Sequence, residues 1–237
     1  FNDYVAAYQA GVSAAFNFSP SQELVLQVTN FRSGEDKDMY VYGRPEGIAK
    51  AKVPVLSTLN WNGLFADKAI HLRYAASWGQ QAKGRNILYL TAGNIYKKGP
   101  VEAYLDVMYS RQGLDNHCII SDMQGLVIEN PVTAQNTEYL SVIADFDYRF
   151  HPHWNAYIKG AYETAGVYKS NGHFEKGLYR TTWNLQGCVE FFPMDNSELM
   201  IFGHVLHKGH KLTERARALG AVAPDTQRIS IGLVYTI

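Results

Sequence analysis

The sequence has little of what marks several common protein classes. Its 237 residues include only two cysteines, which is too few for a scaffold held together by disulfides. Basic and acidic residues balance at 22 each, whereas a general nucleic-acid-binding domain is strongly basic. No run of 18 apolar residues occurs, which excludes a transmembrane helix. The first residues lack the basic stretch and apolar run of a signal peptide. We therefore expect no nucleic-acid partner and no membrane-spanning helix.

The sequence also lacks the motifs of well-known catalytic sites. It contains no Gly-rich phosphate loop, no Gly-x-Ser-x-Gly and no His-Glu-x-x-His. Ser141 and Ser230 could act as nucleophiles only beside a positioned base, and no His accompanies either at a recognisable spacing. We therefore expect neither enzymatic activity nor a cofactor.

Cysteine and histidine offer two further possibilities. Cys118 and Cys188 could form a disulfide if the loop around Cys118 folds inward, but the demanding geometry of the bond favours two separate thiols. His151 and His153 could supply two ligands to a metal ion, and no third ligand is evident. The sequence therefore predicts no metal site.

What the sequence does contain is a period of two. In the last segment, Ile229 and Ile231 share one face, and Arg228 and Ser230 share the other, which is typical of a strand with one apolar face. The pattern recurs in 70–79, 101–110, 139–150, 154–163 and 182–191, and more weakly in 5–18, 23–32, 54–64, 86–97 and 198–209. We predict an all-β chain of eleven strands, with at most one or two helical turns in 211–219.

The connections between these segments alternate in length. Short ones are expected at 19–22, 65–69, 98–100, 151–153 and 194–197, and longer ones at 33–53, 80–85, 112–136, 170–178 and 211–225. An antiparallel up-and-down transmembrane β-barrel has short periplasmic turns and long extracellular loops. We therefore predict that residues 1–237 form a single domain of this kind.

Aromatic residues are predicted to form two girdles at the membrane surfaces. The outer girdle is assigned Tyr4, Tyr8, Trp78, Tyr109, Tyr139, Tyr162, Tyr179 and Trp183. The inner girdle is assigned Phe16, Phe18, Trp61, Tyr96, Tyr148, Phe150, Trp154, Phe191 and Tyr235.

The alternation also divides the strands into a lipid face and a lumen face. The predicted lipid face includes Leu140, Val142, Phe146, Trp183, Leu185, Val189, Ile229, Ile231 and Leu233. The predicted pore-lining residues are His71, Arg73, Glu102, Asp106, Asp145, Asp147, Arg149, Lys159, Glu163, Glu190 and Arg228. Because an Arg or Lys facing lipid at mid-depth costs roughly 2–4 kcal/mol, these side chains are expected to face water or one another.

Eleven is an odd number, whereas bacterial barrels have an even number of strands. An open edge in lipid leaves backbone groups without hydrogen bonds. We therefore expect N-terminal strands before Phe1, or a miscount of one segment. The last strand, 226–237, should pair either with chain outside this sequence or with 5–18.

The C-terminal third resembles the phosphate-selective porin O and P family. The resemblance rests on Glu190–Phe202 (EFFPMDNSELMIF), on Thr226–Tyr235 (TQRISIGLVY) and on the turn region Tyr148–Tyr157 (YRFHPHWNAY). It covers residues 139–237 with useful specificity. The resemblance implies a trimeric outer-membrane porin of roughly 16 strands, of which this chain is the C-terminal part, in a Gram-negative bacterium. It also implies anions such as phosphate as solutes, although the predicted lumen carries both signs of charge.

Two functions from different classes follow. The first is a passive channel for small polar or charged solutes, with a field across its lumen. The alternative is a non-conducting barrel that serves as a subunit or scaffold of a larger outer-membrane assembly, its lumen filled by ion pairs. Barrel width favours the channel, because twelve or more strands leave a lumen that side chains alone do not close. The expected partners are membrane lipid and lipopolysaccharide. A basic cluster in the last long loop could attract anions or bind lipopolysaccharide phosphates, or it could simply be a solvated part of the loop: Lys208, His210, Lys211, Arg215 and Arg217.

Overall fold

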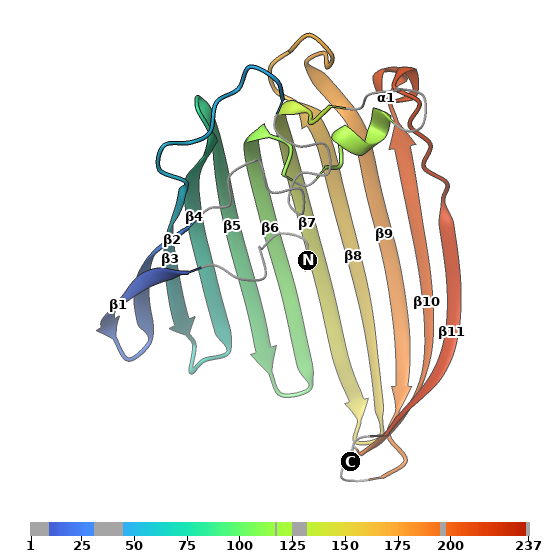
Figure 1. The fold of residues 1–237 in the computed structure, drawn as a ribbon. Helices are drawn as coiled ribbons and strands as arrows, with labels where there is room; N and C mark the ends of the chain where they lie inside the picture. Colours follow the sequence, from blue (N-terminus) through green and yellow to red (C-terminus); the bar gives the residue numbers. More distant parts are fainter. Residues whose placement is uncertain (1–9, 31–44, 117, 125–131, 195–197, 236–237) are drawn as a thin grey trace.

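A computed structural model describes residues 10–30, 45–116, 118–124, 132–194 and 198–235. In this part of the chain eleven strands form one antiparallel sheet, in which each strand pairs with the next along the sequence. Figure 1 shows the sheet as a strongly curved wall with β1 and β11 at its two edges. The predicted all-β, up-and-down architecture is therefore confirmed.

The strands are longer toward the middle of the sheet than at its first edge. They are β1 (Gly11–Ser19), β2 (Gln22–Asn30), β3 (Val55–Phe65), β4 (Ile70–Ala82), β5 (Arg85–Lys98), β6 (Val101–Leu114), β7 (Gln135–His151), β8 (Trp154–Val167), β9 (Gly177–Phe191), β10 (Leu199–Leu212) and β11 (Thr226–Tyr235).

Helical structure in the described residues is confined to connections. A short 3-10 helix, η2 (Ser121–Gln124), lies between β6 and β7, and α1 (Glu214–Ala218) lies between β10 and β11. α1 begins after Thr213, whose hydroxyl accepts a hydrogen bond from the Ala216 backbone. α1 confirms the one or two turns predicted in 211–219, whereas η2 was not predicted. Within the described ranges, no helix is long and apolar enough to cross a membrane.

The register assigns the strand residues to two faces, because directly opposed residues share a face. Phe146 of β7 opposes Ala103 and Ile158, and the apolar face continues across β9 and β10 to β11. The residues predicted to face lipid all lie on this face: Leu140, Val142, Phe146, Trp183, Leu185, Val189, Ile229, Ile231 and Leu233. None of the described residues forms a layer over this face, and Ile231 is 85% exposed.

The other face is the concave one. The segment that follows β6 lies inside the curve of the sheet in Figure 1, and its Asp115 carboxylate accepts a hydrogen bond from Tyr139. Tyr139 shares its face of β7 with Asp145 and Asp147. Polar strand residues therefore point into the concavity, as the alternation predicts.

One connection differs from the prediction. Instead of a long loop at 80–85, β4 continues to Ala82 and β5 starts at Arg85. The Gln81 amide binds the backbone of Leu114 on β6 through both its nitrogen (2.8 Å) and its oxygen (3.0 Å), which holds the strand end in place. Gly84 has φ +71°, a conformation that makes the tight turn possible. The alternation of short and long connections is therefore broken at this hairpin.

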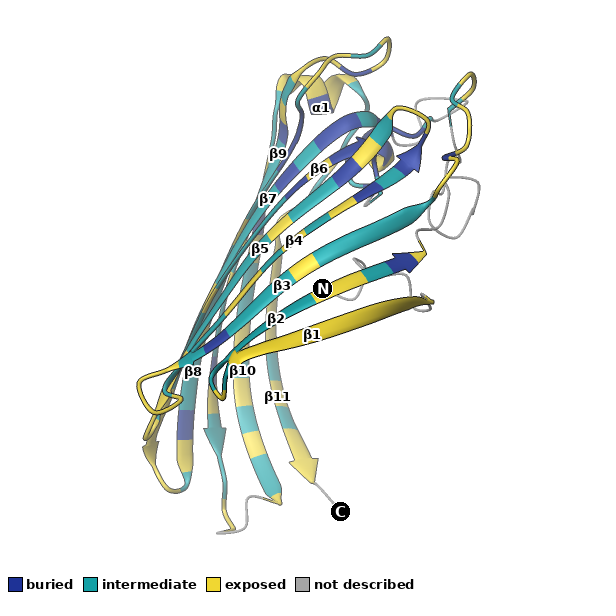
Figure 2. Ribbon diagram, turned by 90° about the vertical axis from the view of Figure 1, so that its left-hand side faces the viewer, coloured by how far each residue is buried: buried dark blue, intermediate teal, exposed yellow. Residues whose placement is uncertain are grey.

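The aromatic girdles are confirmed at ten of the predicted positions. Trp78, Tyr162 and Trp183 are exposed near the end of the strands that carries the long loops, and Phe16, Phe18, Tyr96, Tyr148, Phe150, Trp154 and Tyr235 are exposed near the short-turn end. The girdle positions predicted for Tyr139 and Tyr179 are wrong. Their side chains are only 3% and 2% exposed, because they are buried in a cluster with residues of the loops. Figure 2 shows that most buried residues gather near this long-loop end.

The described residues do not close the barrel. β1 and β11 are the two edges of the sheet, and no ladder joins them. Residues 11–19 pair with β2, so of the two partners considered for the last strand the described chain does not supply the one at 5–18. The predictions that fall on Tyr4, Tyr8, most of the loop 33–53 and part of the turn 194–197 lie outside the described residues.

The two faces predict different responses to the same charge. Leu185→Arg places a guanidinium on the apolar face near the middle of β9, and it should lower the free energy of unfolding by roughly 2–4 kcal/mol. Gln186→Arg, on the concave face, should change it far less. Urea unfolding in lipid vesicles measures both values. Equal losses in the two variants would contradict the assignment of faces.

Candidate functional site

The candidate site is the concave face, where the predicted lumen residues gather. All of them except Arg149 occupy ladder positions on this face: His71 and Arg73 on β4, Glu102 and Asp106 on β6, Asp145 and Asp147 on β7, Lys159 and Glu163 on β8, Glu190 on β9 and Arg228 on β11. They spread over six strands and both halves of the wall. They therefore form a surface rather than one pocket.

Arg149 departs from the predicted position. The ladder between β7 and β8 shifts register after Tyr148, so Arg149 is no longer part of the regular alternation. Its guanidinium donates to the Pro152 carbonyl at 2.6 and 3.2 Å and lies 4.7 Å from the ring centre of Phe192. Arg149 is thus held at the short-turn rim of the sheet, exposed, and does not line its middle.

Several charges on the concave face pair across neighbouring strands. Lys97 lies 2.7 Å from Glu102, and Lys159 lies 4.0 Å from Asp145. Further toward the long loops, Arg180 donates to Glu163 at 3.0 Å. The concave face therefore carries both positive and negative side chains, and within each pair the two charges partly cancel.

Sequence reasoning missed four charged residues of this face. Glu23, Lys97, Arg180 and Lys208 all have concave-face positions in the register. The segments of Lys97 and Lys208 carry apolar residues on both faces, and Arg180 was placed before the predicted start of its strand. The tight turn at Gly99-Pro100 could have revealed Lys97, because a short hairpin places it directly opposite Glu102.

Asn155 joins two carboxylates near the short-turn end. Its Nδ2 donates to Asp147 at 2.9 Å and to Glu190 at 3.0 Å. A neutral amide thus stands between two acids from β7 and β9. Its own oxygen is buried and has no hydrogen-bond partner among the described residues.

A hollow lies between residues of β4, β5, β6 and β7. It has a volume of about 260 Å³, and Arg73 and Asp106 line it from strands on either side of Gly93. A Cβ atom at Gly93 would lie 3.3 Å from Asp106. Glycine therefore leaves room between the basic and the acidic side chain.

At the long-loop end the concave face is covered by a packed cluster of loop and strand residues. This loop cluster consists of Ile120, Met123, Ala134, Tyr139, Ala165, Val167, Phe174, Tyr179 and Ala216. They come from three connections and three strands. The cluster narrows that end of the concavity and fixes the loops to the wall.

Asp115 is the polar centre of this cluster. One carboxylate oxygen accepts from the backbone of Ile120 (3.1 Å), from the backbone of Ser121 (2.8 Å) and from the Ser121 hydroxyl (2.8 Å). The other accepts from the Tyr139 hydroxyl on the wall. Asp115 therefore ties the loop after β6 to β7. Burial raises the pKa of the Asp115 carboxyl, against the opposing effect of these donors.

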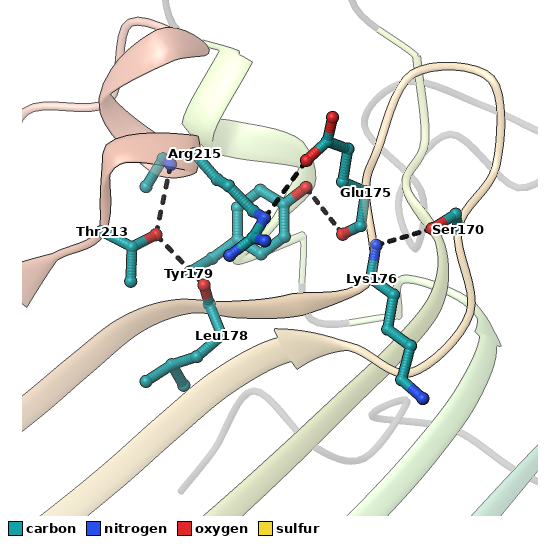
Figure 3. A network of polar contacts seen from close by, with 8 residues as sticks. Ser170, Glu175, Lys176, Leu178, Tyr179, Thr213 and Arg215 are labelled. Atoms are coloured by element: carbon teal, nitrogen blue, oxygen red, sulfur yellow. Dashed lines mark hydrogen bonds and ion pairs between the residues drawn. The ribbon is translucent and has the colours of Figure 1, made fainter.

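A second network joins α1 to the loop between β8 and β9 (Figure 3). The Thr213 hydroxyl donates to the Leu178 carbonyl at 3.1 Å, and Arg215 lies 3.3 Å from Glu175. The Tyr179 hydroxyl donates to the Glu175 carbonyl at 3.0 Å. The two outer loops are thus held to each other.

The residues of the basic cluster predicted near the last loop do not lie together, because strand pairing places them on different faces. Lys208 and His210 have concave-face positions, whereas Lys211 is exposed on the outer side. Arg215 is engaged with Glu175, and Arg217 is exposed on α1. Only Lys211 and Arg217 remain available to a ligand outside the barrel.

Cys118 and Cys188 are thiols, the first in the loop after β6 and the second on the concave face of β9. His153 hydrogen-bonds the Phe192 carbonyl through Nδ1 at 2.7 Å. Within the described ranges, no three His, Cys, Asp or Glu side chains come together so that they could hold a metal ion.

A model of the family phosphate-selective porin O and P matches residues 1–237. The chain belongs to this family. The match reaches well beyond the C-terminal third in which the sequence resemblance was recognised, and it agrees with the curved up-and-down sheet. A comparison with curated proteins found no match.

Two solved structures resemble this porin chain. The outer membrane channel DcaP of Acinetobacter baumannii has a TM-score of 0.64 at 9% identity, covering 95% of this chain and 61% of that one. OccK11 (OpdR) of Pseudomonas aeruginosa has a TM-score of 0.48 at 10% identity, covering 87% and 55%. The chain thus spans less than two thirds of the length of either. The family, together with this fold, places the protein in the outer membrane of a Gram-negative bacterium.

Asp115→Ala should release the loop after β6 without unfolding the sheet. It removes the acceptor of several buried donors, each of which costs about 1–3 kcal/mol when left unsatisfied. Hydrogen exchange at Ile120 and Ser121 should therefore lose at least about 2 kcal/mol of protection. Asp122→Ala, an exposed carboxylate on the same loop, is the matched control. Unchanged protection in Asp115→Ala would contradict this role.

The raised pKa of Asp115 predicts a pH dependence of loop closure. Between the ordinary value near 3.8 and the raised one, the closed loop holds a proton that the open loop has released. The closed loop then binds more protons, so its stability falls as pH rises through this window. Asp115→Asn is neutral at every pH and should remove this slope. Hydrogen exchange, corrected for intrinsic exchange rates, gives the free energy of loop opening at each pH. The same dependence of this free energy on pH in the unmodified protein and in Asp115→Asn would refute the prediction.

Proposed function

We propose that the protein is a passive diffusion channel for small polar or charged solutes and has no catalytic role. The observation that supports this most directly is the division of the sheet into an uncovered apolar face and a concave face with charges of both signs. In a membrane barrel the apolar face meets lipid and the concave face meets water. A polar wall of this kind needs neither a cofactor nor a nucleophile to let solutes pass.

The nature of the solute is part of this proposal. The family description names phosphate, and a phosphate channel would present mainly basic groups. The described concave face instead carries acids at Glu23, Glu102, Asp106, Asp145, Asp147, Glu163 and Glu190, and Arg or Lys at Arg73, Lys97, Lys159, Arg180, Lys208 and Arg228. Nothing in this set singles out phosphate.

A non-conducting scaffold is the second candidate, and the loop cluster favours it. The cluster and the Asp115 contacts place packed protein over part of the concave face. Under this alternative the loops close the lumen, and the loop ends serve as a binding surface for other outer-membrane proteins.

We also propose that strands beyond the described sheet close the barrel and that the protein forms a trimer. The edges β1 and β11 have no partner on their outer sides in the described chain, and unpaired backbone groups are costly in lipid. Lys211 and Arg217, exposed at the long-loop end, are the proposed contacts for lipopolysaccharide phosphate. Size measured in detergent, with and without Lys211→Ala and Arg217→Ala, tests the trimer and its lipid contacts.

Recordings in planar bilayers of protein purified from the outer membrane distinguish the two candidates. A channel should give steady, ohmic conductance. Ala161→Trp adds a bulky side chain to the concave face and should lower it, whereas Gly160→Trp, one residue away on the apolar face, should not. Absence of conductance in the unmodified protein would support the scaffold, and equal effects of both variants would contradict the assigned lumen.

A further inference from the structure

Two opposite charges lie on either side of a glycine, in the half of the concave face nearer the short turns. Arg73 of β4 directly opposes Gly93 of β5, and Gly93 in turn opposes Asp106 of β6. The two charged residues are therefore two strand spacings apart, about 9–10 Å between their Cα atoms. Gly93 has no side chain that could fill the space between them.

The protein itself does not pair these two charges. Among the described residues, the Arg73 guanidinium and the Asp106 carboxylate take part in no hydrogen bond and no ion pair. Other opposite charges on this face do pair across strands, for example Arg180 with Glu163 at 3.0 Å. Arg73 is exposed and Asp106 is half-buried, so both groups remain accessible to a solute.

The space beside the two charges is a hollow of about 260 Å³, which both of them line. This volume is slightly below the roughly 300–1,000 Å³ of pockets that take drug-sized ligands, so the hollow suits a molecule of only a few heavy atoms. The hydroxyl residues Thr91 and Ser141 and the apolar Met108 line it as well. A Cβ atom at Gly93 would lie 3.3 Å from the Asp106 carboxylate, so a larger residue there would reduce the hollow.

A solute that matches this hollow carries a negative and a positive group close together. A carboxylate binds a guanidinium through two parallel hydrogen bonds, and an ammonium group donates to a carboxylate. A solute with a carboxylate alone would be attracted by Arg73 but repelled by Asp106, and a simple amine would meet the converse. An unmatched charge beside a binding group is a recognised source of specificity.

We propose that Arg73 and Asp106 form a binding site for small zwitterions of the amino-acid class on the wall of the channel. Arg73 binds the carboxylate of the solute, and Asp106 binds its ammonium group. None of the residues that line the hollow belongs to the loop cluster, so the site faces the open part of the concavity. This inference rests on the proposed channel function and names a class of solute for it.

The test is a titration of L-alanine against the purified protein in a planar bilayer, in symmetric KCl at neutral pH. Alanine bound at the wall should lower the ionic current in a saturable way, and the half-maximal concentration measures its affinity. Propionate lacks the ammonium group, and ethylamine lacks the carboxylate. Each should need at least about tenfold more, because it loses one charge-assisted contact and meets one repelling charge.

Substitutions in the site distinguish a zwitterion from a simple ion. Arg73→Gln and Asp106→Asn each remove one partner and should raise the half-maximal alanine concentration about tenfold. The double variant Arg73→Asp with Asp106→Arg exchanges the charges and should restore alanine binding, because a zwitterion can bind in the reverse orientation. Gly93→Leu keeps both charges but fills the hollow, and it should weaken binding as well. The current without alanine shows that each variant has inserted.

Arg111→Gln with Glu138→Gln is the matched control. It removes one charge of each sign from β6 and β7, in an ion pair at 3.7 Å on the outer face, and it should leave the half-maximal concentration unchanged. Steady conductance without a saturable response to alanine, or no recovery in the variant with exchanged charges, would overturn this inference and leave the channel in place. No conductance at all would instead overturn the proposed function.

Discussion

The constraint on which the rest of the structure depends is the pairing of backbone N–H and C=O groups within the membrane. Lipid offers no hydrogen bonds, so every strand needs a ladder on both sides. The ten pairings of neighbouring strands meet this need on both sides of β2 to β10 and on one side of β1 and β11. Once the ladder is in place, each residue's face is decided, and a slip of one residue would exchange Asp145 with Phe146 at the lipid surface. The division between an apolar and a polar face is therefore a consequence of register.

The same constraint relaxes at the strand ends, and the irregular features gather there. The register shifts at Gln80/Ala82, Tyr148/His151 and Ala165/Gly166 all lie within the last few residues of their strands. At the first, the Gln81 side chain binds the backbone of Leu114 at the end of β6. Near the shift at Ala165/Gly166, Tyr179 enters the loop cluster, and its hydroxyl binds the carbonyl of Glu175. The strand ends can thus deviate from regular pairing to hold the loops, while the middle of each strand keeps its regular register.

Sequence predicted what depends on local alternation and missed what depends on distant partners. The faces of Phe146, Leu185 and Ile231 follow from neighbouring residues, and they are confirmed. The hairpin after Ala82 was missed because its strand end is held by the Gln81 amide on Leu114, a contact across 33 residues. Tyr139 was assigned to a girdle because nothing near it in sequence announces its partner Asp115, which lies 24 residues earlier. The spacing of residues along the sequence reveals neither the contact of Gln81 with Leu114 nor that of Tyr139 with Asp115.

The acids of the concave face show how the surroundings of a carboxylate indicate its role. Asp115 is enclosed and receives donors on both oxygens, an arrangement that leaves no capacity for a passing solute and that holds a loop in place. Asp147 and Glu190 both accept from the amide nitrogen of Asn155, and Asp147 also lines a hollow on this side of the sheet. The same kind of group thus holds a loop in place at one end of the wall and joins neighbouring strands through an amide at the other.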